Sequence, residues 1–367
     1  MNSAHFSVGI NYWPGRSPAT MWHAFDDGAV RDDLAHIAAL GFDAVRCLVR
    51  WDALQPKRDA LDSATLDRLE RFVTLAADAG LRVMPALCGA IGEHSFMPAW
   101  SRTLRDLYSG PLLAAQLAIA RAAGERIAAH DNVVAWDLGH AFTAVRAARA
   151  GMRTSGEHAS EPVAERDIAA WSSAVAKELR AVSIAATAGA YDGDLTQDTS
   201  VRFGSLCAPF PFASIQGANE RLPFARGPFD PEALPFLAML TAAFSFKPVL
   251  ASGIASPTFP HQREAENAAY ATAVLERLHA DGRLGAYWWC WADDPEQPPY
   301  EPLAGIIRAG GGEKPVAVAL SAFARERRPV VRAADMPMIS STYYYRTLPD
   351  SAQTLYEAFL GFVAARR

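Results

Sequence analysis

The chain of 367 residues has few cysteines, and their spacing gives them no evident chemical role. Cys47, Cys88, Cys207 and Cys290 form no CxxC pair, so neither a zinc-binding pattern nor a disulfide framework is indicated. Three of the four fall inside apolar runs, which is typical of reduced thiols in a core. The sequence also lacks a phosphate-binding glycine loop. We therefore expect no metal and no cofactor.

Long apolar runs and blocks of basic charge are also missing. The most apolar stretch, residues 236–254, is interrupted by Lys247 and Pro248 and is too polar to span a membrane. A net charge of −5 without a Lys/Arg block indicates neither a nucleic-acid surface nor an anionic-membrane surface. The first residues show neither the basic segment nor the apolar core of a signal peptide, so we expect a cytoplasmic protein. The oligomeric state is left undefined.

What the chain does contain is an alternation of short apolar runs with longer segments of helical period. Half of its residues are hydrophobic and 20% are charged, which is typical of a large globular core. The alternation predicts repeated βα units around a parallel sheet. The predicted strands are residues 6–11, 44–49, 82–87, 133–138, 183–189, 212–216, 248–253 and 284–291. Eight strands close a barrel, so we expect an α/β fold of the (β/α)8 TIM-barrel type.

The segments between and after these strands complete the expected architecture. Helical periods run through residues 30–40, 61–79, 112–129, 164–181, 231–243, 263–280 and 315–327. Residues 191–210 have little periodic signal and predict a long loop. We expect a barrel domain over residues 1–328 and a C-terminal extension over residues 329–367. The apolar helix of that extension, residues 352–364, should pack on the outside of the barrel.

Several segments, in register along the chain, resemble the clan A glycoside hydrolases related to family five, the mannanase- and cellulase-like TIM barrels. They are GFDAVRCLVRW at 41–51, PAW at 98–100 with DLY at 106–108, WDLG at 136–139, KPVLASGIA at 247–255, YWWCWAD at 287–293, GIIR at 305–308 and KP at 314–315. The resemblance implies the barrel fold and a sugar site at the C-terminal ends of the strands. It does not by itself imply activity.

The two catalytic glutamates of this family have no counterpart in the sequence. In the resembling proteins, the fourth strand is followed by Asn and the acid/base Glu, whereas this chain has His140 and Ala141. The nucleophile position of the seventh strand falls on Gly253, or on Ser252 if the alignment shifts by one residue. Retaining hydrolysis needs two carboxyl groups about 5–5.5 Å apart, and none of these residues supplies one. The resemblance therefore implies a disabled catalytic pair.

Relocated carboxylates are the alternative source of catalysis. Glu93 lies beside His94 in the loop after the third strand, and Glu220 follows the sixth strand. A carboxylate next to an imidazole is a plausible acid/base unit, although a solvated loop pair is the simpler interpretation. Asp293 and Glu301 match residues that the family carries in addition to its catalytic pair, so we expect them to be structural or to shape the cleft.

More of the family's ligand-binding residues than of its catalytic acids have a counterpart in this sequence. Arg46 matches the arginine that hydrogen-bonds the nucleophile in the family. Without that glutamate it needs another acceptor, either on a ligand or on a loop acid. His140 is expected either to contact a ligand or to fill vacated space. Flat rings that stack on sugars are expected near the strand ends, where Trp289 and Trp291 share one face by period two. The other candidate rings are Trp13, Trp51 and Trp100.

Three functional hypotheses follow from the sequence. The first is a glycosidase-like barrel that lacks retaining hydrolase activity and binds a carbohydrate or related polar ligand in the cleft. The second is an active β-mannoside- or β-glucoside-type hydrolase with relocated carboxylates. The third is a non-catalytic scaffold or interaction protein, whose cleft should be filled by its own side chains.

Overall fold

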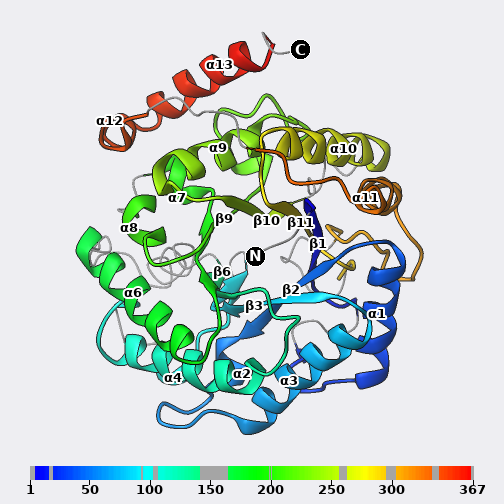
Figure 1. Cartoon of the computed structure of the whole chain (residues 1–367), viewed down its shortest axis with the longest axis vertical. Coiled ribbons are helices and arrows are strands. Elements are labelled where there is room, and N and C mark those ends of the chain that lie inside the picture. Colours follow the sequence, from blue (N-terminus) through cyan, green and yellow to red (C-terminus); the bar gives the residue numbers. More distant parts are fainter. Residues whose placement is uncertain are drawn as a thin grey trace.

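A parallel sheet that curves into a barrel, with helices arranged around it, forms the centre of the molecule (Figure 1). The computed structural model describes residues 5–15, 20–91, 94–101, 106–140, 164–197, 199, 201–255, 263–294, 303–332 and 339–364; at residues 94 and 140 it describes the backbone only. The barrel confirms the fold expected from the sequence.

The strands of the barrel follow one another in parallel register. They are β1 Ser7–Tyr12, β2 Ala44–Arg50, β3 Arg82–Cys88, β6 Trp136–His140, β7 Ala186–Thr187, β8 Gly189–Tyr191, β9 Ala213–Gly217, β10 Val249–Ala255 and β11 Gly285–Trp289. Their order in the sheet is β7-β6-β3-β2-β1-β11-β10-β9-β8. Only Ala188 separates β7, which pairs with β6, from β8, which pairs with β9. Together they make the fifth strand, so each predicted strand is found.

Helices surround the sheet, and the last two, α12 and α13, lie outside that ring (Figure 1). They are α1 Asp27–Ala39, α2 Trp51–Leu54, α3 Ser63–Asp78, α4 Gly110–Ile127, α6 Glu165–Ala181, α7 Gly193–Thr196, α8 Phe203–Cys207, α9 Ala233–Ser245, α10 Glu264–Ala280, α11 Pro315–Arg325, α12 Ser341–Arg346 and α13 Asp350–Ala364. A short hairpin, β4 Ala90–Ile91 with β5 His94–Ser95, follows β3. None of the helices in the described ranges is long and apolar enough to cross a membrane.

Helix α3 illustrates how the sequence sets these elements. The Asp62 carboxylate accepts a hydrogen bond from the Thr65 backbone N–H at 2.6 Å, which caps the first turn. Leu69, Phe72 and other apolar residues of one face are buried against the barrel. Gly80, at φ +74°, reverses the chain into β3. Gly41, at φ +92°, makes the same kind of tight connection between α1 and β2.

The long loop expected over residues 191–210 is only partly correct. Two short helices, α7 and α8, lie within that interval. Both are buried for most of their length, and they hold Leu195 and Phe203 in the core outside the sheet. At four and five residues, they are shorter than the two turns from which helical periodicity can be recognised.

The C-terminal extension packs against helix α9, outside the ring of helices (Figure 1). Helix α9 is apolar on nearly all sides, a pattern that requires burial on all sides. Tyr356 of α13 packs on Phe224 and Phe236, with ring centroids 4.9 and 5.1 Å apart. Tyr344 of α12 packs on Phe244 at 5.1 Å. The extension therefore covers apolar surface that the barrel leaves open, as the sequence predicted.

Candidate functional site

A buried ion pair lies inside the barrel between β2 and β6. The Asp137 carboxylate accepts hydrogen bonds from Nε and Nη2 of Arg46 at 3.0 and 2.8 Å. Neither side chain has any solvent exposure. The sequence left open which group would accept from Arg46; the acceptor is a strand residue, and neither a ligand nor a loop acid is needed.

The same carboxylate also accepts from the backbone. Its other oxygen accepts the N–H groups of Gly139 at 3.2 Å and Gly189 at 2.7 Å. Burial raises the pKa of Asp137 above its ordinary value, and the charge of Arg46 together with these N–H groups opposes that rise. Asp137 thus bonds neighbouring backbone in addition to holding Arg46.

Asn11 extends this network to the other side of the barrel. Its Oδ1 accepts from Nη1 of Arg46 at 2.9 Å. Its Nδ2 donates to the carbonyls of Ser252 at 3.0 Å and Trp288 at 3.2 Å. Strands β1, β2, β6, β10 and β11 are thereby joined through polar side chains. Sequence analysis missed Asn11, although a lone amide in the apolar run of the first strand was a usable signal.

The position expected to carry the nucleophile faces the barrel interior. The register of β10 shifts between Ala251 and Gly253, which is a bulge in the strand. A Cβ built on Gly253 would lie 3.0 Å from Cγ of Gln216, a residue of β9. The Ser252 hydroxyl instead lies 3.5 Å from the carbonyl of Ile215. Of the two candidate positions, Gly253 is thus the one whose side-chain direction leads to another interior residue.

Aromatic rings gather where the strands end. Trp13 follows β1 and Trp289 ends β11, and their ring centroids lie 6.2 Å apart with the planes tilted by 37°. They belong to an apolar cluster at the strand ends, which comprises Trp13, Leu48, Ala86, Cys88, Ile91, Phe96, Ala218, Ala255, Trp289, Cys290 and Ala304. Trp13 is 3% exposed and Trp289 is 7% exposed. We refer to these residues below as the strand-end cluster.

The other tryptophans named from the sequence are not part of this cluster. Trp291 points outward, with its ring 5.2 Å from His36 of α1, so the expectation that it shares a face with Trp289 is wrong. The strand ends at Trp289, and period two no longer applies beyond it. Trp51 is buried in α2 and donates to Gln55 at 3.2 Å. Trp100 donates to the Gln55 carbonyl at 2.9 Å.

The candidate acids are placed differently from one another. Glu220 lies in a short 3₁₀ turn after β9 and is exposed. Asp293 is buried and pairs with Lys314 at 2.7 Å, and it accepts the Gly305 N–H at 3.0 Å. This contact fits the structural role expected for Asp293.

The remaining candidates lie beyond what the structure describes. Glu93, Ala141 and Glu301 fall outside the described residues, and for His94 and His140 only the backbone is described. His140 ends β6 and pairs in register with Cys88 of β3. Its backbone therefore reaches the same level as the strand-end cluster, to which Cys88 belongs.

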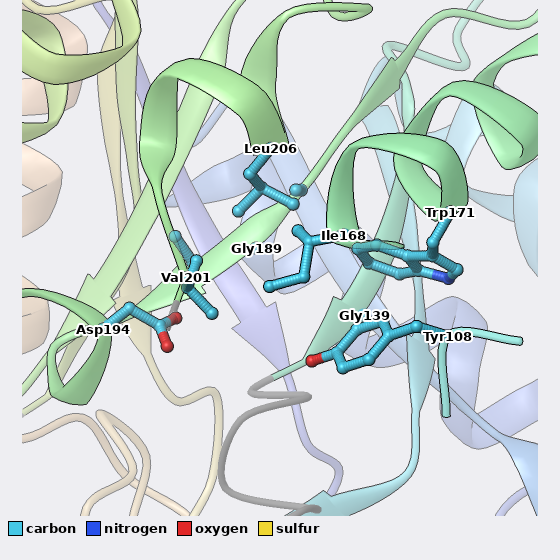
Figure 2. A pocket seen from close by; sticks show the side chains of 10 residues that line it. Tyr108, Gly139, Ile168, Trp171, Gly189, Asp194, Val201 and Leu206 are labelled. Atoms are coloured by element: carbon cyan, nitrogen blue, oxygen red, sulfur yellow. The ribbon is translucent and has the colours of Figure 1, made fainter. Parts of the chain in front are cut away.

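A small cavity and an open depression among the described residues both differ from the expected cleft. A cavity of about 20 Å³ lies between β6, β8 and α6. Figure 2 shows Tyr108 and Trp171 on one side of it and Asp194 and Val201 on the other. It has room for about one water molecule and not for a sugar ring.

The second hollow is an open depression of about 500 Å³ at the opposite end of the barrel. It is lined in part by Arg180, Ser183 and Lys247, which precede β7 and β10. Enzymes of this fold work at the C-terminal ends of the strands, so this depression is not the expected active site. No group of three or more His, Cys, Asp or Glu side chains suited to a metal ion occurs in the described ranges.

The fold is that of the TIM-barrel glycoside hydrolases. GH5_18 from Streptomyces cattleya in complex with GlcNAc superposes with a TM-score of 0.85 at 21% identity, over 99% of this chain and 92% of that chain. A Glu-to-Ala variant of GH5_18 from Bifidobacterium longum subsp. longum, in complex with Manβ1-4GlcNAc, has a TM-score of 0.77 at 20% identity over 90% and 80% of the two chains.

A further neighbour is the exo-beta-1,4-mannosidase Op5Man5 from Opitutaceae bacterium strain TAV5. Its TM-score is 0.76 at 23% identity, over 89% of this chain and 62% of that chain. No protein-family model and no curated protein matches the sequence. At identities of 20–23% these likenesses establish the fold.

Proposed function

We propose that the chain is a glycoside-hydrolase-like barrel that binds a carbohydrate at the C-terminal ends of its strands and lacks retaining hydrolase activity. The observation that carries this proposal is Gly253. It faces the barrel interior beside Gln216 and has no side chain that could form a glycosyl ester. Ala141, at the expected acid/base position, has no proton to transfer.

The structural neighbours support binding without cleavage. Glu-to-Ala variants of two GH5_18 proteins have been obtained in complex with Manβ1-4GlcNAc. In those proteins the barrel therefore holds a disaccharide when a glutamate has been replaced by alanine. A natural chain with Ala141 and Gly253 is expected to resemble such variants in its chemistry.

The proposal is tested by measuring binding and turnover on the same preparation. Isothermal titration with Manβ1-4GlcNAc should give a saturable signal, and Trp289→Leu should weaken it because an aromatic face is lost at the strand ends. Trp51→Leu is the matched control, since Trp51 is buried in α2 away from the cluster. Aryl β-mannoside and β-glucoside should not be hydrolysed. Turnover that Trp289→Leu abolishes and Trp51→Leu spares would instead support relocated carboxylates.

A second candidate, the non-catalytic scaffold, is favoured by one observation. Every member of the strand-end cluster is at most 7% exposed, so this part of the barrel mouth is filled by its own side chains. A scaffold would show no saturable signal with any neutral or anionic sugar at millimolar concentration. In a scaffold, Trp289→Leu would change the stability of the fold and no binding signal.

A further inference from the structure

Gln216 occupies the space next to the position where a nucleophile is missing. A Cβ on Gly253 would lie 3.0 Å from Cγ, 3.2 Å from Cβ and 3.3 Å from Oε1 of Gln216. On the other side of β9, a Cβ on Gly189 would lie 2.7 Å from Nε2 of Gln216. The carboxamide thus fits between two glycines, and a larger residue at either position would crowd it.

The amide donor of Gln216 has no acceptor in the part of the chain that the structure describes. Its Nε2 is buried without a hydrogen-bond partner, and the residue is 5% exposed. On the side of Gly189, a Cβ built on that glycine would also lie 2.7 Å from both oxygens of the Asp137 carboxylate. That carboxylate already accepts from Arg46 and from two backbone N–H groups. A buried donor in this position requires an acceptor from elsewhere.

The residues that follow Gln216 and Gly253 toward the strand ends have small side chains. Two residues further along β9 and β10 come Ala218 and Ala255, and both belong to the strand-end cluster. The bulky rings of that cluster, Trp13 and Trp289, come from β1 and β11. On β9 and β10 themselves, the residues of the cluster that follow Gln216 and Gly253 are thus alanines and not large rings.

The charge near Gln216 is already balanced. The Arg46 guanidinium is paired with Asp137 at 2.8 Å, and both are fully buried. The described floor of the site thus contributes no uncompensated positive charge that would favour a carboxylate or phosphate. An acceptor that suits a neutral amide donor in such a place is a hydroxyl, ring or acetamido oxygen.

We propose that Gln216 recognises the ligand of this site by donating a hydrogen bond from Nε2 to an oxygen of a neutral saccharide. This inference rests on the proposed function and deepens it, because it names a specificity-determining residue and the charge class of the ligand. Gln216 takes the volume that a side chain on residue 253 would use. It offers a donor where a hydrolase of this fold carries an anionic acceptor.

The test compares the full chain with Gln216→Leu, which keeps the volume and removes the donor. Titrations use Manβ1-4GlcNAc and GlcNAc as neutral probes, and glucose with glucuronic acid as a neutral and anionic pair. We expect Gln216→Leu to weaken binding of the neutral probes at least tenfold, while its unfolding temperature stays equal to or above that of the wild type. The loss of a buried amide donor without a partner does not destabilise the fold, so the unfolding temperature should not fall. If Gln216 had only a structural role, its replacement would not combine weaker binding with an unchanged or higher unfolding temperature.

Thr187→Val is the matched control. Thr187 also lies in the barrel interior, but its hydroxyl is bonded to Ser214 at 3.1 Å and to the Phe212 carbonyl at 3.2 Å. We expect it to lower the unfolding temperature and to change affinity less than twofold. Equal affinities of wild type and Gln216→Leu, or tighter binding of glucuronic acid than of glucose, would overturn the role of Gln216 while leaving carbohydrate binding intact. Absence of binding by the wild type to every probe would overturn the proposed function as well.

Discussion

Arg46 and Asp137 form a charge pair in the barrel interior, where neither side chain has any solvent exposure. Each charge is tolerated there only because the other is present, together with the donors of Gly139 and Gly189 and the Asn11 acceptor. The pair joins side chains of β2 and β6 directly.

Replacing Arg46 should lower the free energy of unfolding much more than replacing an arginine of a surface ion pair. Arg46→Met leaves Asp137 as an uncompensated buried charge, which we expect to cost about 3–5 kcal/mol in the free energy of unfolding. Urea denaturation followed by tryptophan fluorescence measures this change. Arg121→Met is the matched control, because its ion pair with Glu178 lies on the surface and Arg121 is 63% exposed. Equal urea midpoints for the two variants would contradict the argument.

At the scale of elements, the carboxylate of Asp230 links the C-terminal helix α13 to the barrel. The Tyr356 hydroxyl donates to Asp230 at 2.6 Å, and Arg226 pairs with the same carboxylate at 2.8 Å. Burial opposes ionisation of Asp230, but Arg226, Tyr356 and backbone N–H groups together hold its pKa below the ordinary value. The hydrogen bond thereby couples the docking of α13 on α9 to the charge of a residue in the β9–α9 connection.

This coupling gives the docking of α13 a defined pH dependence. Because the folded pKa of Asp230 is lowered, its contribution is fully present above the unfolded pKa of about 3.9 and is lost as the pH falls through the folded value. We expect Asp230→Asn to be less stable than wild type at neutral pH, with the difference shrinking below about pH 4. Thermal unfolding between pH 7 and pH 3 measures it. A difference that stays constant over this range would refute the coupling.

Several elements could be predicted from the sequence because local signals determine them. Gly41 and Gly80 mark the ends of α1 and α3, where the backbone takes φ values of +92° and +74°. The apolar alternation likewise located every barrel strand. Helices α7 and α8 were missed because they are too short for a periodic pattern and depend on tertiary burial.

The candidate site was less predictable because its contacts join distant strands. The partner of Arg46 lies 91 residues away, and nothing local in the sequence distinguishes Asp137 from the loop acids. Trp291 was misplaced because the strand ends at Trp289, two residues before it. Gln216 was overlooked because the sequence does not show that Gly189 and Gly253 flank its side chain.

For the whole molecule, the barrel brings residues 137, 189, 216 and 253 together from four strands, and this arrangement limits what a carboxyl group introduced at residue 253 could do. Retaining cleavage needs two carboxyl groups about 5–5.5 Å apart, and the resembling family carries them at the ends of the fourth and seventh strands. The double variant Ala141→Glu with Gly253→Glu introduces a glutamate at each of the two corresponding positions. The new side chain at residue 253, however, would meet Gln216 at 3.0–3.3 Å from its first carbon onward.

We therefore expect the double reversion alone to remain inactive and the triple variant with Gln216→Ser to hydrolyse aryl β-mannoside. Serine at residue 216 frees the volume that the carboxamide takes, so that a carboxylate on residue 253 can settle in the barrel interior. A positioned general acid contributes roughly 10²–10⁴ in rate, and the triple variant should lose a corresponding factor when residue 141 is returned to Ala. Initial rates of phenol release for the double variant, the triple variant and the variant with residue 141 returned to Ala measure both steps. Equal activity of the double and triple variants would mean that Gln216 does not obstruct residue 253.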